Sequence, residues 1–294
     1  MADRIMQRLA ALPVLPEARA ALAWLVEHDW HGEEIVQERE RSQATLEAVY
    51  RALGGDPKDL EPFLLAWLTL RATLARLDHL QDNELTNPAP LSAVASIGEH
   101  YNLVFAYYVL ATALLDGLDD TALPPRRLRE LTRLWNDTML WAASGQQRDL
   151  ARIGPQDQVD AVLEHFQEAI QAKAGAVYAL AFGGTAVLAT DDTQTIAALS
   201  LIGQIYGILL QFSDDFLDAN AQTDPALTLA QVYTRVRTIS GLALPPHQLQ
   251  HYWDHIYSCY IEQVEQVLAI LSPQVQAPVR ALFRSTFDSW PHEG

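Results

Sequence analysis

The sequence contains little that would support export or a disulfide-stabilised fold. Its single cysteine, Cys259, rules out any disulfide within the chain. The first residues include Arg4 and Arg8 and lack the apolar core that a signal peptide requires. We therefore expect a cytoplasmic protein.

Basic residues are also scarce. The chain has 20 lysines and arginines against 37 aspartates and glutamates, which gives a formal net charge of -17. A protein with this balance repels phosphate-rich polymers and anionic lipid headgroups. We therefore expect neither nucleic acid nor an anionic membrane surface as a partner.

Two long runs, residues 174–190 and 193–213, contain no charged residue. Their lengths approach the about 20 residues that span a bilayer. The second run contains three glutamines and leads directly into Asp214 and Asp215, which would be costly to place in lipid. We predict two helices buried inside a bundle, and no membrane span.

Alternating strand patterns of five or more residues are missing, whereas apolar residues recur at helical spacing almost throughout. Stretches with glycine, proline or paired aspartates divide the chain into about ten helices. No Gly/Ser-rich linker separates these helices. We predict an all-α fold and a single domain of residues 1–294. The predicted helix breaks are residues 12–16, 54–57, 87–90, 124–125, 154–155, 183–184, 191–192, 224–225 and 245–246.

Two acidic clusters lie within these apolar helices. Each repeats an aspartate at positions i and i+4, which places both carboxylates on one face of a helix. The aspartates are Asp78 and Asp82 in the first cluster and Asp214, Asp215 and Asp218 in the second. Because no lysine or arginine lies between Lys173 and Arg235, metal ions are better neutralising partners than salt bridges. The all-oxygen donor set favours Mg²⁺, or Mn²⁺, over zinc. The alternative is two acidic helix ends exposed to solvent.

The nine histidines offer a weaker signal. His251 and His255 are spaced i and i+4, but the glutamate of a zincin helix is not between them. We therefore do not expect a zinc site at these two histidines.

The second cluster ends a longer pattern in which small residues precede the acids. Two further landmarks lie upstream of it in the chain. The three segments are Gly145-Gln146-Gln147-Arg148-Asp149-Leu150, then Lys173-Ala174-Gly175, then Gly203-x-x-x-Gly207-x-x-x-Gln211-x-x-Asp214-Asp215-x-x-Asp218. With the first cluster, this ordered pattern covers about residues 50–220 and resembles the trans-isoprenyl diphosphate synthases, or polyprenyl synthetases, of the class I isoprenoid synthase superfamily. The glycines let neighbouring helices approach closely.

The resemblance implies a helical bundle around a deep apolar cavity, with the two acidic helices facing each other and holding three Mg²⁺ ions. These ions grip an allylic prenyl diphosphate and stabilise the departing pyrophosphate. The implied metal ligands are Asp78, Asp82, Asp214 and Asp218, with Asp215 acting through water. The implied substrate contacts are Lys173 at the diphosphate, Gln211 near the reacting carbon, and Gln146, Arg148 and Leu74. A homodimer is implied as well.

The cavity floor is expected on the helix that carries Asp78. One to three turns earlier lie Leu74, then Leu70 or Arg71, then Trp67. Arg71 would sit badly in an apolar pocket, so its position tests the phase of this helix.

The sequence departs from the family mainly where a second substrate, isopentenyl diphosphate, would bind. Residues 54–62 carry acids in place of the family's paired arginines, and residues 83–88 contain no arginine. His79 stands where the family has a second aspartate. Losing cations weakens a diphosphate site, and Arg76 and Arg148 are candidate replacements.

Three alternatives follow from these departures. The chain is a prenyltransferase with a rebuilt second site, or a terpene synthase-like lyase that needs one allylic diphosphate alone, or a non-catalytic partner subunit. Retention of all five aspartates disfavours the third, because unused carboxylates around a cavity repel one another.

Overall fold

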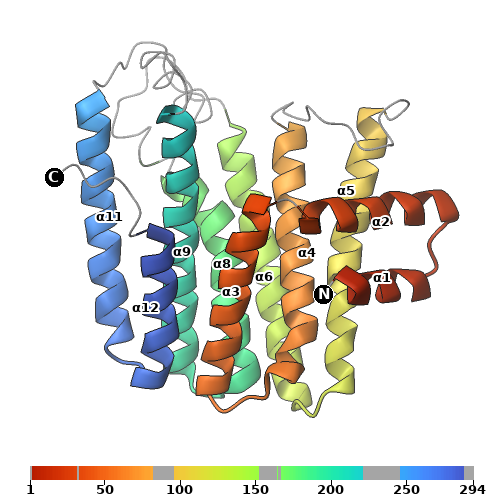
Figure 1. The fold of residues 1–294 in the computed structure, drawn as a ribbon, viewed down its shortest axis with the longest axis horizontal. Coiled ribbons are helices and arrows are strands. Elements are labelled where there is room, and N and C mark those ends of the chain that lie inside the picture. The colour runs from red at the N-terminus through yellow and green to blue at the C-terminus, as the bar shows by residue number, and fades with distance from the viewer. Residues whose placement is uncertain are drawn as a thin grey trace. The chain divides into compact units, whose positions relative to one another are not determined.

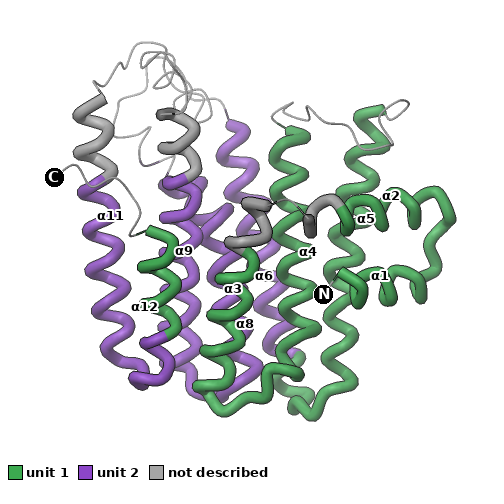
Figure 2. The backbone as a smooth tube through the Cα atoms, in the orientation of Figure 1, with its two compact units in different colours: residues 1–128, 278–294 green, residues 129–277 purple. Residues whose placement is uncertain are grey.

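A computed structural model describes residues 2–31, 33–81, 96–151, 164, 167–220 and 246–287. For residues 28–31, 33–38, 214–220 and 246–253 the description covers the backbone alone. Every regular element in these ranges is helical, which confirms the predicted all-α fold. The helices separate into two compact units, which Figure 2 distinguishes. The single domain of residues 1–294 stays a prediction.

The first unit comprises residues 1–128 and 278–294. Its helices are α1 (Ala2–Ala11), α2 (Pro16–His31), α3 (Glu33–Ala52), α4 (Pro57–Gln81), α5 (Ile97–Leu114) and the 3₁₀ helix η2 (Leu115–Asp120). In Figure 1, α4 and α5 run side by side, and α1 and α2 lie across their direction. Three α4 side chains, Phe63, Trp67 and Leu70, are fully buried and form the centre of this unit's core.

The second unit comprises residues 129–277. It contains most of α6 (Pro125–Asp149), the π-helical turn η3 (Gln171–Gly175), α8 (Ala176–Ala189), α9 (Thr193–Asn220) and α11 (Pro246–Leu268). The boundaries between the units fall inside α6 and inside α12 (Pro273–Phe287). The α8 and α9 helices pack along each other, and α11 packs against α9 (Figure 1).

Most of the predicted helix breaks that the structure describes are confirmed. Helices begin at Pro16, Pro57, Pro125, Thr193 and Pro246, each directly after or within a predicted break. The predicted breaks at 87–90, 154–155 and 224–225 lie outside the described residues.

The predicted break at Gly183 and Gly184 is wrong, because α8 continues through both residues. A Cβ atom at Gly183 would lie 2.2 Å from the Ser200 hydroxyl oxygen on α9. The glycine therefore makes room for a neighbouring helix. Its propensity cost, about 1 kcal/mol, is outweighed by the burial of almost every other α8 side chain.

Three helical stretches are long and apolar enough to cross a membrane by length and composition: Ile97–Asp120, Gln167–Ala189 and Thr193–Ser213. Inside the protein, 78% of the apolar window is buried for the second, 56% for the third and 39% for the first. The absence of a membrane span therefore stays a prediction.

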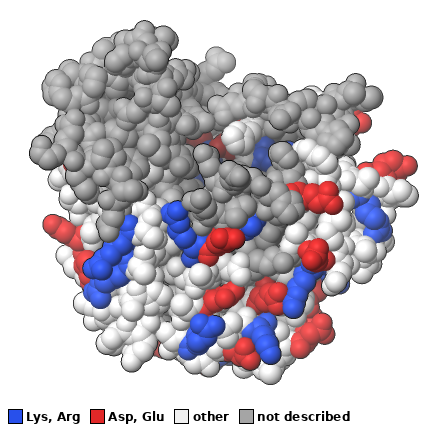
Figure 3. Space-filling model, in the orientation of Figure 1, with Lys and Arg blue, Asp and Glu red and all other residues white. Residues whose placement is uncertain are grey.

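Acidic and basic side chains are interspersed on the described part of the face in Figure 3.

Candidate functional site

Lys173 lies in η3, the π-helical turn that leads into α8. Its Nζ atom donates a hydrogen bond to Oδ2 of Asp149 at 2.9 Å. The two side chains are 21% and 25% exposed, so the pair is shielded from water more than a typical surface ion pair. Since π-turns in helices are frequent at functional sites, the local backbone singles out the same lysine as the sequence pattern.

Gly145 allows α6 to approach this turn. A Cβ atom at residue 145 would lie 2.7 Å from the backbone nitrogen of Lys173 and 2.8 Å from the Cβ atom of Ala172. Both neighbours are fixed to the main chain, so any side chain at 145 would push the turn away from α6. The glycine therefore has a direct role in placing Lys173 beside Asp149.

Two more glycines bring α9 against η3 and α8. A Cβ atom would lie 2.3 Å from the Tyr178 carbonyl oxygen at Gly203, and 2.5 Å from the Ala174 carbonyl oxygen at Gly207. The expected close approach of helices at these glycines is thus present. The pairs 203 with 178 and 207 with 174 also show that α9 runs antiparallel to η3 and α8.

That register locates the second acidic cluster along the helix. Continuing it by one turn places Gln211 level with residue 170, and Asp214 about 9 Å along α9 from the level of Lys173, at 1.5 Å per residue. The α9 backbone is helical to Asn220, so Gln211, Asp214, Asp215 and Asp218 share one uninterrupted helix. Gln211 is half-buried.

The first acidic cluster lies at the end of α4 in the first unit. Asp78 is half-buried in the last turn of this helix, and Asp82 lies outside the described residues. Leu74 is half-buried, whereas Leu70 and Trp67 are fully buried.

Arg71 is half-buried on α4, as Leu74 is. Burial lowers the pKa of Arg39, Glu40 raises it, and the positive charge of Arg71 lowers it further, so Arg71 lies near Arg39 of α3. The lining of a cavity by Trp67, Leu70 and Leu74, for which the position of Arg71 was the expected test, stays a prediction.

The two arginines named as candidate contacts of a diphosphate each interact with another residue of the protein. Arg148 forms an ion pair with Glu168, and the guanidinium carbon of Arg76 lies 6.0 Å from the centre of the Trp24 ring. Gln146 is half-buried next to Gly145 near the end of α6. Contact of these residues with a diphosphate stays a prediction.

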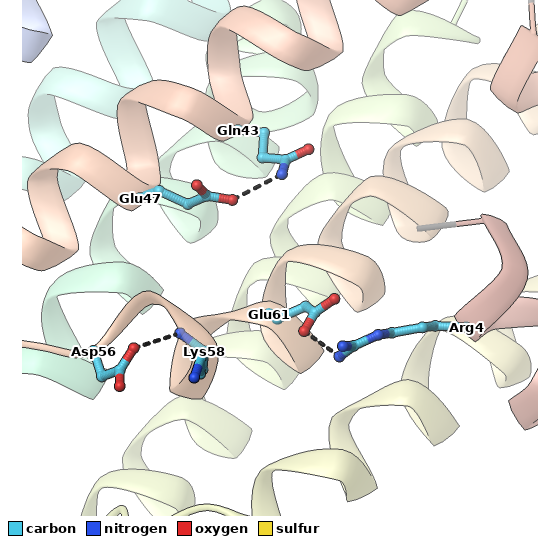
Figure 4. A network of polar contacts seen from close by, with 6 residues as sticks. All are labelled: Arg4, Gln43, Glu47, Asp56, Lys58 and Glu61. Atoms are coloured by element: carbon cyan, nitrogen blue, oxygen red, sulfur yellow. Dashed lines mark hydrogen bonds and ion pairs between the residues drawn. The ribbon is translucent and has the colours of Figure 1, made fainter.

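The acids of residues 54–62 have structural uses. Asp56 Oδ1 accepts a hydrogen bond from the Lys58 backbone N–H at 3.1 Å, which caps the start of α4. Glu61 forms an ion pair with Arg4 of α1, as Figure 4 shows. The one cation of this segment, Lys58, is exposed.

The structure thus groups the predicted site residues by unit. Gln146, Arg148, Lys173 and Gln211 belong to the second unit, with the α9 backbone of the three later aspartates, and Leu74 and Asp78 belong to the first. Among the described residues, no three histidine, cysteine, aspartate or glutamate side chains gather into a metal site. The side chains of Asp214, Asp215 and Asp218 fall outside that description, so the metal ligands stay predictions.

Asp149 had no role assigned from the sequence. It lies one helical turn after Gly145, on the same face of α6. That spacing places it beside whatever Gly145 approaches, so the signal was present. The π-turn had no comparable signal, since nothing in the sequence of residues 171–175 distinguishes it from an ordinary helix.

The chain is similar to known proteins in sequence over part of its length. Residues 92–226 match the family model for polyprenyl synthetase. The chain is 30% identical over 155 residues to the nonaprenyl diphosphate synthase of Mycobacterium tuberculosis, covering 52% of this chain and 42% of the relative. It is 26% identical over 186 residues to the geranylfarnesyl diphosphate synthase of Natronomonas pharaonis, covering 61% of this chain and 52% of the relative. The chain thus spans about half the length of the curated relatives it matches.

Solved structures show the same fold over nearly the whole chain. The geranylgeranyl pyrophosphate synthetase of Pyrococcus horikoshii superposes with a TM-score of 0.69 at 15% identity, covering 99% of this chain and 95% of the other. The farnesyl diphosphate synthase of T. brucei superposes with a TM-score of 0.68 at 16% identity, covering 97% of both chains.

Proposed function

We propose that this chain is a member of the polyprenyl synthetase family, and that it ionises an allylic prenyl diphosphate and transfers its prenyl group. The observation that carries the proposal is the fixed position of Lys173. Asp149 holds its ammonium group, Gly145 brings η3 against α6, and Gly207 brings η3 against α9. This arrangement presents a cation next to the helix that carries the second acidic cluster.

Magnesium ions are the proposed cofactor, three of them by family resemblance. Lys173 is the basic residue nearest before the second cluster and already pairs with Asp149. Arg148, further upstream, pairs with Glu168. The cluster's charge thus favours cations from outside the chain. Carboxylate oxygens of Asp78, Asp82, Asp214 and Asp218 fit Mg²⁺, or Mn²⁺, as ligands. When bound, the ions stabilise the negative charge of the departing pyrophosphate.

The chain's own residues have separate roles in the proposed reaction. Lys173 contacts the diphosphate, and Gln211 lies near the carbon from which the diphosphate departs. Breaking that carbon–oxygen bond yields an allylic cation and pyrophosphate. The double bond of isopentenyl diphosphate then forms the new carbon–carbon bond, and loss of a proton restores a double bond. Leu74 contacts the growing hydrocarbon.

A lyase remains the second candidate because of residues 54–62. Their acids cap α4 and pair with Arg4, and their one cation is an exposed lysine. This segment therefore offers little to a second diphosphate. A lyase acting on one allylic diphosphate would not need it. The names of the two relatives favour elongation over this candidate.

We further propose a cytoplasmic homodimer that forms through α5. Four large apolar side chains follow one another at i+4 spacing along α5 and are exposed: Ile97 (58%), Tyr101 (42%), Phe105 (65%) and Val109 (47%). We call this row the α5 ridge. It contains no charged residue, so two copies can approach along it despite a net charge of -17 on each chain.

The test of the function is pyrophosphate release by the purified protein with Mg²⁺ and farnesyl diphosphate, with and without isopentenyl diphosphate. Release that depends on both substrates is the expected result. Release from farnesyl diphosphate alone would support the lyase instead. No release in either condition, also with geranyl or geranylgeranyl diphosphate, would leave the non-catalytic alternative and contradict the proposal.

A further inference from the structure

One face of α11 carries a row of metal-binding side-chain types. His247, His251, His255 and Cys259 occupy four consecutive i+4 positions of this helix. The chain has nine histidines and one cysteine in total, so four of these ten residues share one helical stripe. Residues at this spacing lie on the same side of a helix.

Cys259 and His255 are both exposed, and they lie close together. The Cys259 Sγ atom is 3.8 Å from Nε2 and 4.0 Å from Nδ1 of His255. Zinc bonds of 2.3 Å to sulfur and 2.0–2.1 Å to nitrogen, at a tetrahedral angle, separate the two donor atoms by about 3.6 Å. The two side chains therefore already have nearly the spacing that one bridging ion requires.

The position of the pair on α11 leaves it open to solvent. The helix buries Val264 and Leu268, whereas Asp254, Cys259 and Glu262 are exposed. Exposed carboxylates nearby and the net charge of -17 attract cations to this surface. Because no group of three possible ligands gathers among the described residues, the described side chains supply two ligands, and His251 and His247 continue the row by register alone.

We propose that His255 and Cys259 form a surface binding site for a borderline-soft divalent cation, with Zn²⁺ as the physiological candidate. Binding replaces the thiol proton, so the Cys259 S–H bond is exchanged for a sulfur–metal bond and one proton is released. Thiolate and imidazole ligands select Zn²⁺ over the hard ion Mg²⁺. The site needs no glutamate between its ligands, unlike a zincin helix. It is also independent of the proposed catalytic function.

The single cysteine makes a direct test possible. The rate at which iodoacetamide alkylates Cys259 is measured in the full-length protein with excess Mg²⁺, with and without Zn²⁺, and again after chelation with EDTA. Protection by Zn²⁺ that EDTA reverses is the expected result. His255→Ala should reduce the protection roughly tenfold or more at a given Zn²⁺ concentration, a loss that even outer partners of metal ligands cause. His100→Ala, which removes a histidine from α5, is the matched control and should leave the protection unchanged.

Co²⁺ titration provides the second readout. A sulfur-to-cobalt charge-transfer absorption should appear in the wild-type protein and in His100→Ala, and should be absent in Cys259→Ser. The oxygen ligands of the acidic clusters cannot produce this absorption. Equal alkylation rates with and without Zn²⁺, or protection that persists in His255→Ala, would overturn the proposal.

Discussion

Lys173 and Asp149 form a direct hydrogen bond in the candidate site. We propose different roles for the two residues. In the proposed reaction Lys173 contacts the substrate diphosphate, whereas Asp149 holds the lysine in place. An ammonium group fixed before the substrate arrives loses little entropy on binding. A change at each residue should therefore affect catalysis in a distinguishable way.

We predict that Lys173→Met lowers kcat/KM about 10- to 100-fold, the effect of removing one hydrogen bond to a charged group. Asp149→Asn should cause a smaller loss, because the lysine is kept but is held less firmly. In the double variant, Asp149→Asn should have almost no additional effect. Steady-state kinetics of the four proteins measure the coupling; fully additive losses would show that Asp149 does not act through Lys173.

The aspartates of the two clusters give a second prediction. Asp78→Asn, Asp82→Asn and Asp214→Asn should each abolish turnover, because an amide replaces a charged metal ligand. Their unfolding free energies should stay within about 0.5 kcal/mol of wild type, because the substitution leaves the volume of the side chain almost unchanged. Asp137→Asn, an exposed acid on α6, is the control and should be fully active. Wild-type turnover in either Asp82→Asn or Asp214→Asn would end the metal-site proposal.

Residue types and spacing were enough to predict the close helix approach at the glycines. They also singled out the aspartates and Lys173 as candidates, because these depend on sequence order along single helices. The partners of charged residues were harder to find. Arg148 pairs with Glu168, twenty residues away, and Arg76 lies over Trp24 of another helix. Such contacts depend on how helices pack, which periodicity alone does not determine.

At the scale of helices, contacts through glycine determine how closely α6, η3, α8 and α9 approach one another. The atoms that an added Cβ would meet at Gly145 and Gly203 are main-chain atoms or Cβ atoms fixed to the main chain. A main-chain atom cannot rotate away as the end of a long side chain can, so added volume must separate the helices.

We predict that Gly145→Ala and Gly203→Ala each destabilise the protein by about 1–3 kcal/mol, the usual cost of overpacking. Gly98→Ala in the first turn of α5 is the matched control. Its added methyl group would meet only the Ser96 hydroxyl oxygen, at 3.8 Å, so it should be neutral or slightly stabilising. Urea unfolding followed by circular dichroism measures all three. Equal stability of Gly203→Ala and Gly98→Ala would contradict the close helix packing.

Helix boundaries at prolines were predicted well. Proline fits the first turn of a helix, and it prevents a helix that precedes it in the chain from continuing through it. The boundary at Gly183 was not predicted well, since glycine only weakens a helix. Burial of the surrounding α8 side chains then decides the outcome. The Arg4–Glu61 pair also emerges only when α1 and α4 are placed together.

At the scale of the whole molecule, the α5 ridge is the main apolar feature without an assigned use in the fold. The opposite side of α5 buries Leu103, Tyr107 and Leu110, so the helix is apolar on two sides. One side serves the core of its own unit. The ridge is therefore available to a second copy of the chain.

We predict that the protein is a dimer in solution and that Phe105→Glu converts it to a monomer, because a charge in the middle of the ridge would be buried on association. Gln263→Glu, an equal charge change on the exposed side of α11, is the control and should remain dimeric. Light scattering after size-exclusion chromatography measures the mass. A wild-type monomer would contradict the dimer, and flotation of that monomer with lipid vesicles would assign the ridge to a membrane.

The fold class could be predicted from the sequence because it depends on local patterns spread over much of the chain. The sequence did not decide as clearly between elongation and lyase chemistry. The residues that separate elongation from lyase chemistry are the cations that would hold a second diphosphate, and residues 54–62 lack the expected arginines without showing which others replace them.

The most direct measurement of the central claim is the mass of the product formed from farnesyl diphosphate, isopentenyl diphosphate and Mg²⁺. Prenyl transfer predicts diphosphates longer than the starting substrate by whole isoprene units, formed only when isopentenyl diphosphate is present. A hydrocarbon or alcohol of unchanged carbon number, formed equally without isopentenyl diphosphate, would contradict the account.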